Sequence, residues 1–186
     1  MKEVSDSLPF VLTFPYDDVI KARARTLFLN QALSNSHRGV DARIIGAIGE
    51  AAFEIACERI GIPFVRIGGE STVADYKLQN GALLEVKTKE RSVRPRQGFE
   101  ASRPQYNEEH QKVDYYVFAS VWNPSKTRHA FVEVAVLGAI SSSDFDRVSY
   151  EVKIGTKLGS GRGAWTAMRN IRIEELGDLK VVLGDG

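Results

Sequence analysis

The spacing of apolar residues predicts two helices in the first third of the chain. Between residues 17 and 35, apolar side chains recur three and four positions apart, on a face made of Ile20, Ala24, Leu27 and Phe28. Asp17 is a suitable N-cap for this helix. A second helix is predicted over residues 42–60, because Asp41 can cap its start and Gly61 favours its end.

Apolar runs and alternation predict strands in the remainder of the chain. The expected strands cover residues 62–67, 73–78, 82–89, 115–122 and 130–137, with shorter ones at 150–154 and 170–173. Residues 90–103 are polar and bear several arginines, which predicts a loop. Pro104 is a favoured first helical residue, which predicts a helix over residues 105–112. This order predicts an α/β fold with a mixed central sheet, in a single domain spanning residues 1–186.

The turn around Asn80-Gly81 decides which residues of the two flanking strands share a face. A two-residue loop places Asp75 and Glu85 on opposite faces of the sheet. A three-residue loop, with Gly81 left-handed in a bulged type I turn, instead pairs Asp75 with Glu85. Directly paired residues lie about 5 Å apart at Cβ, close enough for two carboxylates to share one cation. Because a shared cation requires this second register, we predict the three-residue loop.

Composition is typical of a globular protein in a reducing compartment. Hydrophobic residues make up 43% and charged residues 26% of the chain, and the single cysteine, Cys57, allows no internal disulfide. The N-terminus carries acids and a proline where a secretory signal needs an apolar region, and no apolar run approaches the about 20 residues of a membrane span. We therefore expect a cytoplasmic protein with no membrane partner. The net charge of +1 requires any nucleic-acid surface to be local.

An acid followed two residues later by lysine occurs four times, beginning at Asp75, Glu85, Glu151 and Asp178. The surroundings favour Glu85. Lys87 shares its face of the strand, while Leu84 and Val86 point into the opposite layer. Charge on such apolar strands indicates a cleft, although an exposed hairpin whose Glu and Lys are merely solvated is the simpler alternative. Two carboxylates and a lysine can hold a divalent metal against a phosphodiester.

These residues, in this order, resemble the PD-(D/E)XK, or restriction-endonuclease-like, nuclease superfamily. The match runs through Ile48-Gly49-Glu50, Ala74-Asp75-Tyr76 and Leu84-Glu85-Val86-Lys87, and it covers residues 42–122. Ala74 stands in place of the nominal proline. The resemblance implies an αβββαβ core with a mixed central sheet flanked by helices. The N-terminal helix (17–35) and a β-rich C-terminal extension (130–186) are additions to that core.

The resemblance also implies the roles of the site residues. Asp75 and Glu85 correspond to metal ligands, with the Val86 carbonyl as a third, and Lys87 to the group that orients or activates the attacking water. Glu50 corresponds to the helix acid that binds metal directly or through water. Helical spacing alone fits Glu50 equally to a solvent-facing stripe and to a cleft edge. The implied cofactor is Mg²⁺, with Mn²⁺ as a substitute.

Basic residues cluster just after the predicted metal ligands. A phosphate backbone is expected beside a loop of this kind. The candidate DNA-binding residues are Lys89, Arg91, Arg94, Arg96 and Arg103, with Arg162 in a second, glycine-rich loop. The simpler interpretation for any one of these residues is a solvated side chain.

The sequence thus predicts a metal-dependent DNA endonuclease with a restriction, homing or related DNA-processing role. Three alternatives stay open: a structure-specific nuclease or resolvase, an exonuclease, and a non-catalytic DNA-binding module of the same fold. A structural or assembly protein is a further class, supported only by the near-neutral charge. Cutting both strands at one site usually calls for two active centres, which is compatible with a homodimer or higher homo-oligomer.

Overall fold

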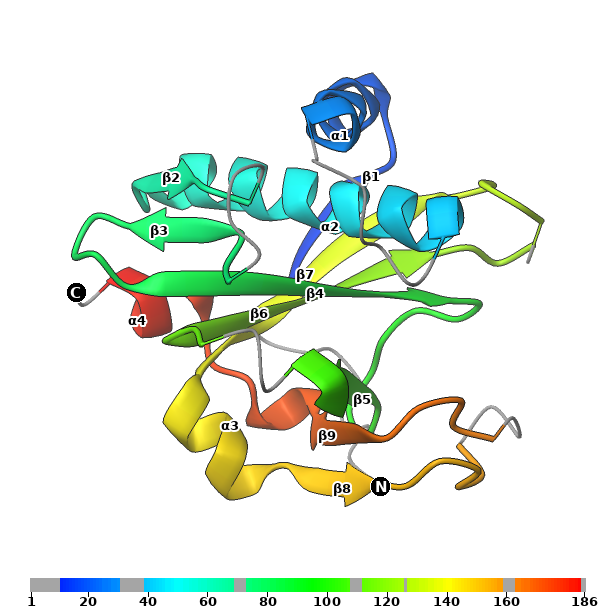
Figure 1. The fold of residues 1–186 in the computed structure, drawn as a ribbon. Helices are drawn as coiled ribbons and strands as arrows, with labels where there is room; N and C mark the ends of the chain where they lie inside the picture. Colours follow the sequence, from blue (N-terminus) through cyan, green and yellow to red (C-terminus); the bar gives the residue numbers. More distant parts are fainter. Residues whose placement is uncertain are drawn as a thin grey trace, which may run out of the picture.

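The computed structural model describes residues 11–30, 39–68, 73–107, 112–125, 127–158 and 163–184. Its centre is a six-stranded sheet in the order β1-β7-β6-β4-β3-β2 (Figure 1). β4 and β6 run parallel, and the other neighbouring pairs are antiparallel. The chain therefore has the predicted α/β class with a mixed sheet. The strands are β1 (Leu12–Pro15), β2 (Phe64–Arg66), β3 (Tyr76–Leu78), β4 (Leu83–Arg91), β6 (Tyr115–Trp122) and β7 (Glu133–Ser141).

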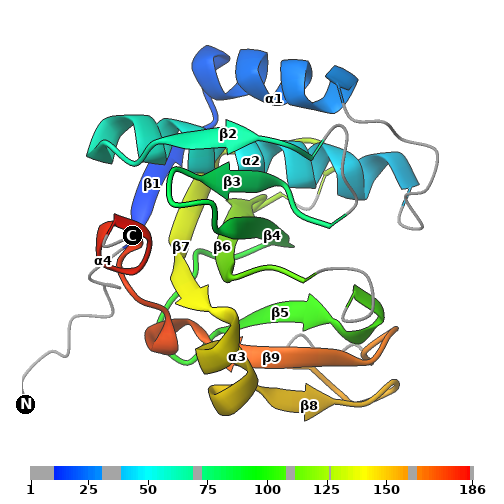
Figure 2. The same ribbon diagram turned by 60° about the vertical axis from the view of Figure 1, so that its left-hand side comes forward.

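Two helices, α1 (Asp18–Asn30) and α2 (Gly39–Ile60), lie on one side of this sheet. α2 packs directly on β4, β6 and β7, and α1 packs on α2 (Figure 2). Asp17 caps α1 as predicted, since its Oδ1 accepts hydrogen bonds from the backbone N–H groups of Val19 and Ile20, both at 3.1 Å. Gly61, with φ of 77°, ends α2 as predicted. Among the described residues, no helix is both long enough and apolar enough to cross a membrane.

The main core fills the space between α2 and the sheet. Helix positions that face the strands carry small or apolar residues, so the helix approaches the sheet closely. Fully buried side chains from both layers meet here, among them Ile48, Phe53, Tyr76, Leu84 and Val117. The rings of Phe53 and Tyr76 lie 4.9 Å apart. This core fixes the orientation of α2 relative to β3 and β4.

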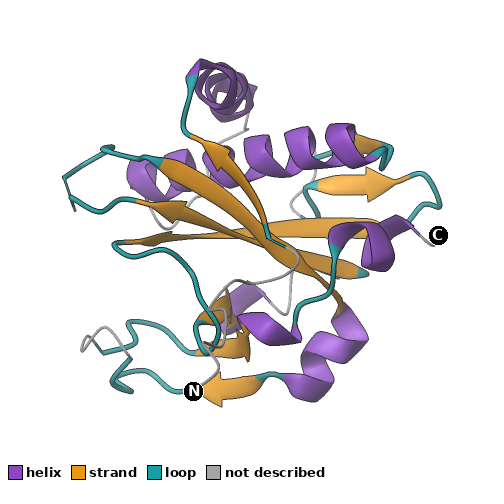
Figure 3. Ribbon diagram, turned by 180° about the vertical axis from the view of Figure 1, so that it is seen from behind, coloured by secondary structure: helices purple, strands orange, loops and turns teal. Residues whose placement is uncertain are grey.

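A smaller antiparallel sheet of three strands, in the order β5-β9-β8, lies on the other side of the main sheet (Figure 3). A second apolar cluster joins the two sheets and includes Tyr116, Phe118, Phe145 and Ile171. The last described element, α4, packs on β7. The elements of this half are β5 (Glu100–Pro104), α3 (Ser142–Val148), β8 (Tyr150–Val152), β9 (Met168–Arg172), the 3-10 helix η2 (Ile173–Glu175) and α4 (Leu179–Gly184).

Several predicted boundaries were wrong. The expected loop over residues 90–103 contains the end of β4 and all but the last residue of β5. Pro104 ends a strand that pairs with β9, so it does not begin a helix. Only a short 3-10 helix, η1 (Gln105–Asn107), lies within the predicted helix over residues 105–112, and residues 108–111 of that prediction lie outside the described residues. The C-terminal extension carries helical turns as well as strands.

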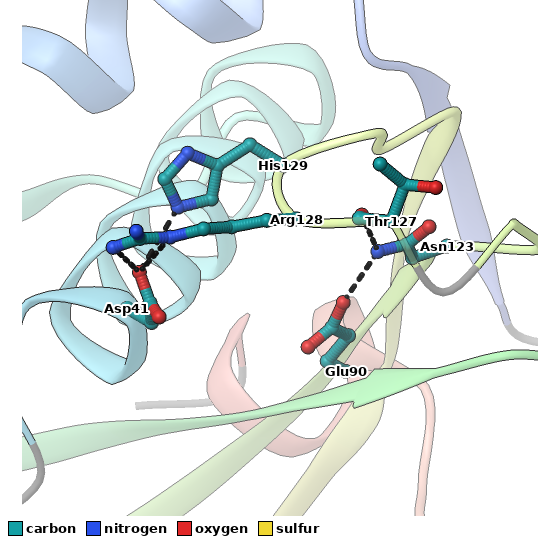
Figure 4. Close-up of polar contacts among 6 residues, drawn as sticks. All are labelled: Asp41, Glu90, Asn123, Thr127, Arg128 and His129. Carbon is teal, nitrogen blue, oxygen red and sulfur yellow. Dashed lines mark hydrogen bonds and ion pairs between the residues drawn. The ribbon is translucent and has the colours of Figure 1, made fainter.

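The connection between β6 and β7 ties together the start of α2 and the end of β4 (Figure 4). Arg128 and His129 contact Asp41 Oδ1 at 2.7 Å and 3.1 Å. From the same connection, the side-chain amide of Asn123 donates to Glu90 Oε1 at 2.7 Å. Asp41 lies inside the first turn of α2, which begins at Gly39, and the prediction of Asp41 as its N-cap was therefore wrong.

Candidate functional site

The hairpin between β3 and β4 has the predicted three-residue loop. Tyr76 pairs with Leu84. The Leu78 N–H donates to Ala82 O at 2.8 Å, and the Gly81 N–H donates to Leu78 O at 3.0 Å. Gly81 has φ of 91°, the left-handed conformation that a bulged type I turn requires. The turn therefore sets the register that the shared site needs.

Asp75 lies just before β3 and binds the backbone of β4. Its own N–H donates to Leu84 O at 3.0 Å, so the regular ladder ends at Tyr76. Its Oδ2 accepts a hydrogen bond from the Val86 N–H at 2.8 Å. Asp75 thus binds Val86, the neighbour of Glu85, through its side chain. The sequence had predicted that Asp75 pairs with Glu85 in the regular ladder. Because the N–H and C=O of one strand residue point to the same side, the Val86 carbonyl also faces this edge.

Glu85 and Lys87 form a close ion pair on β4. Lys87 Nζ lies 2.7 Å from Glu85 Oε1, and the side chains of Lys87 and Glu85 are only 13% and 8% exposed. Leu84 and Val86 point the other way, into the core under α2, as the alternation predicted. The interpretation of this strand as an exposed hairpin with a merely solvated Glu and Lys is therefore wrong.

Glu50 is buried on α2 and is not part of a solvent-facing stripe. Its exposed fraction is 7%, and Arg66 Nη2 of β2 lies 3.6 Å from its Oε2. Burial raises the pKa of Glu50 to about 7, Arg66 opposes this shift, and the negative charge of Glu85 adds to it. Glu50 and Glu85 therefore interact electrostatically although they lie on different elements.

Asp75 belongs to the same electrostatic cluster. Burial raises the pKa of this carboxyl well above its usual range, and the charges of Glu85 and Glu50 raise it further. The Val86 N–H and the Lys87 ammonium act in the opposite direction. Two buried carboxylates, Glu50 and Glu85, and the partly buried Asp75 disfavour full ionisation unless a cation joins them.

Gly49 makes this closeness possible. A Cβ atom at Gly49 would lie 1.9 Å from Thr88 Oγ1, so only glycine lets α2 approach β4 at this point. Neither Gly49 nor Arg66 was predicted from the sequence to contribute to the site. A glycine in the interior of the predicted helix, next to the acid Glu50, is the signal that could have found the close approach. No comparable local signal marks Arg66.

The donor set fits a hard divalent cation such as Mg²⁺. Carboxylate oxygens and a backbone carbonyl are the ligands that such ions prefer, and a cation would relieve the raised pKa values of Asp75 and Glu50. Among the described residues, however, no three His, Cys, Asp or Glu side chains already converge as a metal-binding group. The ion pair between Lys87 and Glu85 occupies one carboxylate in this arrangement.

The other acid-x-lysine motifs have different surroundings. Lys77, which follows Asp75 by two residues, is exposed. Glu151 is exposed on β8 and accepts a hydrogen bond from Gln105 Nε2 at 3.3 Å. Asp178 caps α4 through a 2.8 Å hydrogen bond from the Lys180 N–H. Of these acid and lysine pairs, the pair at Glu85 is the one that is buried.

Two of the predicted DNA-binding residues lie on the face of β4 that carries Glu85 and Lys87. Lys89 Nζ donates to Ser102 Oγ of β5 at 3.4 Å. Arg91 donates to the backbone carbonyl of Glu100 and packs on the ring of Phe99. Both side chains are partly buried. They therefore extend the charged face of the strand away from the carboxylates.

The remaining predicted DNA-binding residues have different surroundings. Arg94 is exposed, stacks on Trp122 at 4.1 Å and pairs with Glu133. Arg96 is exposed and lies over Phe99. Arg103 is 5% exposed, and its Nη1 donates to the Tyr116 hydroxyl at 2.7 Å. This placement favours a structural role for Arg103. Arg162 lies outside the described residues.

Two surface hollows flank α1, and neither contains the candidate site. One, of about 430 Å³, is lined by Arg23 and Glu54 among other residues. The other, of about 290 Å³, lies beside Phe28 and His129. The clustered carboxylates of α2, β3 and β4 are therefore a separate feature of the molecule.

Comparison with known proteins gives no relative from which a function can be transferred. No family model matches the chain, and no curated protein matches it. The function is therefore inferred from the geometry of the site.

Proposed function

We propose that this protein is a magnesium-dependent DNA endonuclease of the PD-(D/E)XK type. One observation carries the proposal: Asp75 and the Glu85–Lys87 ion pair meet around the backbone of Val86, with Glu50 buried beside them. A structural ion pair needs only one acid for each base. Lys87 is paired with Glu85 and Arg66 with Glu50, so Asp75 is one acid more than these bases require. A bound cation would explain this excess and the raised pKa values of Asp75 and Glu50.

The order of the elements supports the same interpretation. Helix α2 carries Glu50, the β2–β3–β4 meander carries Asp75 and Glu85, and β6 then lies parallel to β4. This order resembles the first part of the αβββαβ core. The described residues offer only η1 between β5 and β6, where the superfamily has its second core helix.

Asp75, Glu85, Glu50 and the Val86 carbonyl would hold the ion. When bound, Mg²⁺ supplies Lewis-acid polarisation of the phosphate and lowers the pKa of a coordinated water, and Mn²⁺ can substitute. Lys87 has a separate task. Its ammonium lies next to Glu85, where it can donate a hydrogen bond to a phosphate oxygen or to the attacking water. Its positive charge then offsets the negative charge that develops during the reaction.

A cleavage assay with the full chain tests the proposal. Supercoiled, nicked, linear and branched DNA are incubated with Mg²⁺, or with EDTA as a blank. We expect Mg²⁺-dependent cleavage that Asp75→Asn and Glu85→Gln each abolish while the thermal unfolding transition is retained. Glu151→Gln is the matched control, because it removes the acid of a second acid-x-lysine motif from an exposed strand. Cleavage at the parent rate by Asp75→Asn or Glu85→Gln would refute the assigned ligands.

The substrate panel also separates the alternatives. Release of nucleotides from linear ends would identify an exonuclease, and selective cutting of branched DNA would identify a resolvase. Tight DNA binding without any cleavage would identify a non-catalytic module.

Lys87→Ala separates chemistry from binding. Because the lysine charge matters most in the transition state, turnover should fall far more than affinity for DNA. Lys153→Ala, the lysine of the exposed motif, is the control and should leave both quantities unchanged. An equal loss of affinity and turnover in Lys87→Ala would contradict the proposed role.

A further inference from the structure

The face of β4 that carries the candidate site continues past Lys87 into an excess of positive charge. Glu85, Lys87, Lys89 and Arg91 follow one another at every second position, so their side chains leave the same face of the strand. Among the described residues, no carboxylate lies within ion-pair distance of Lys89 or Arg91. Lys89 contacts a neutral hydroxyl, Ser102 Oγ, at 3.4 Å.

These cations are partly buried. The pKa of Lys89 is lowered to about 8, mainly by burial and in addition by the positive charge of Arg91. Burial likewise lowers the pKa of Arg91 to about 10, and the negative charge of Glu100 opposes the shift at both residues without cancelling it. A cationic side chain in this condition gains stability from any anion that can enter beside it.

A buried hydroxyl lies on the neighbouring strand of the same patch. Ser120 of β6 pairs with Lys89 in the parallel ladder, and residues paired in this way share a face. Ser120 is 1% exposed, and its Oγ has no hydrogen-bond partner among the described residues. The patch thus combines one ammonium group with two hydroxyls, from β4, β5 and β6.

We propose that Lys89 and Ser102 hold the phosphate next to the scissile phosphate on the strand that is cut. This inference rests on the proposed function, since Lys87 defines the position of the scissile group. Residues two apart on a strand are separated by about 6.6 Å, which is similar to the spacing of successive phosphates in an extended strand. Lys89 binds a non-bridging oxygen, and the Ser102 hydroxyl donates to the same phosphate.

Single methylphosphonate substitutions test this assignment, because each removes the charge of one phosphate. A cleaved duplex is prepared as a series with the substitution at each successive position, and affinity is measured with Ca²⁺ in place of Mg²⁺. The parent protein should lose about tenfold or more in affinity when the neighbouring phosphate is neutral. Lys89→Met should bind unmodified DNA more weakly than the parent by a similar factor. Its affinity should fall almost no further on the duplex in which that neighbouring phosphate is neutral.

Two further variants keep the test independent of folding. Ser102→Ala, a smaller change, should show the same insensitivity at the same position, to a lesser degree. Lys77→Met, on the exposed hairpin strand, should bind every duplex of the series as the parent does. Equal additional losses at every position for the parent and Lys89→Met would overturn the proposal. The proposal would also be overturned if the position at which methylphosphonate no longer weakens binding by Lys89→Met does not adjoin the cleavage site.

Failure of the proposed function would look different. Suppose that no DNA is cleaved, yet the affinities of Lys89→Met and Ser102→Ala are both unaffected by methylphosphonate at one shared position. Lys89 then still holds a phosphate, but the nuclease proposal and the adjacency to a scissile group are both refuted. If cleavage occurs and no position distinguishes Lys89→Met from the parent, the nuclease proposal stands and this inference fails.

Discussion

Replacement of Gly49 by alanine would test whether the close approach of α2 to β4 maintains the candidate site. The added Cβ would lie 1.9 Å from Thr88 Oγ1 and 2.8 Å from Thr88 Cβ and Cγ2. Thr88 belongs to β4, which pairs with β6 from Leu84 to Arg91, with Ala119 opposite Thr88. The strand therefore cannot retreat easily, and α2 must move instead.

The expected destabilisation follows from two opposing effects. Alanine stabilises a helix interior by about 1 kcal/mol relative to glycine. Overpacking of a filled site costs about 1–3 kcal/mol, and an overlap this severe belongs at the upper end. We expect a net loss of about 2 kcal/mol in the free energy of unfolding, which is a fall of about 4–8 °C in Tm for a chain of this length.

Chemical denaturation and the DNA cleavage rate together provide the assay. Gly46→Ala is the matched control, because it lies in the same helix and a Cβ there would meet nothing within 4 Å. That variant should be stabilised by about 1 kcal/mol. Gly49→Ala should also lose cleavage beyond its loss of stability, since the shift displaces Glu50 relative to β4.

Thr88→Ala provides a rescue. It removes the two atoms Oγ1 and Cγ2 from the overlap with a new Cβ at Gly49, and leaves Thr88 Cβ at 2.8 Å. The double variant should therefore recover part of the stability, but not all of it. The proposed close approach is refuted if Gly49→Ala is as stable as Gly46→Ala, or if Thr88→Ala adds its own cost without any recovery.

Three other predictions concern the charges around the site. Because the pKa of Glu50 is raised to about 7, the folded state holds this proton more tightly than the unfolded chain, and the free energy of unfolding in EDTA should fall as pH rises from about 4.5 to 7. In urea denaturation, Glu50→Gln should show a smaller fall, and at pH 8 it should be more stable than the parent by up to about 3 kcal/mol. Tyr76→Phe should lower the free energy of unfolding by about 1–2 kcal/mol in the same assay, since the buried Tyr76 hydroxyl donates to Glu54 Oε1 at 3.0 Å. Joint neutralisation of Arg94 and Arg96 should reduce the log–log salt dependence of DNA binding by about 0.9 for each phosphate that the protein no longer neutralises, and an unchanged slope would place the DNA backbone elsewhere on the protein.

The parts of the fold that the sequence predicted are those set by short-range interactions. The cap at Asp17 depends on backbone groups two and three residues away, and the turn at Gly81 depends on a single left-handed residue. Both are encoded within a few residues. The alternation of β4 likewise identified Glu85 and Lys87 as sharing one face, and the structure places them 2.7 Å apart.

The errors came from pairings between distant segments. Residues 100–104 are a strand because β9, which lies far later in the chain, pairs with them. The burial of Arg103 depends on Tyr116 and Phe145 from other elements, so its arginine-rich surroundings suggested a surface loop. The hydrogen bond from Val86 to Asp75 also could not be predicted, because it requires the ladder to end at Tyr76.

The electrostatics of β4 give one physical reason to connect the two proposals. At one end, burial together with the charges of Glu85 and Glu50 raises the pKa of Asp75, which favours a bound cation. At the other end, burial lowers the pKa of Lys89, which favours a bound anion. Buried charges left without an opposite charge cost stability, so a chain selected for stability alone would keep neither Asp75 nor Lys89 in this state. A divalent cation and a phosphate strand bound together would compensate both ends of β4, and neither ligand alone would do so.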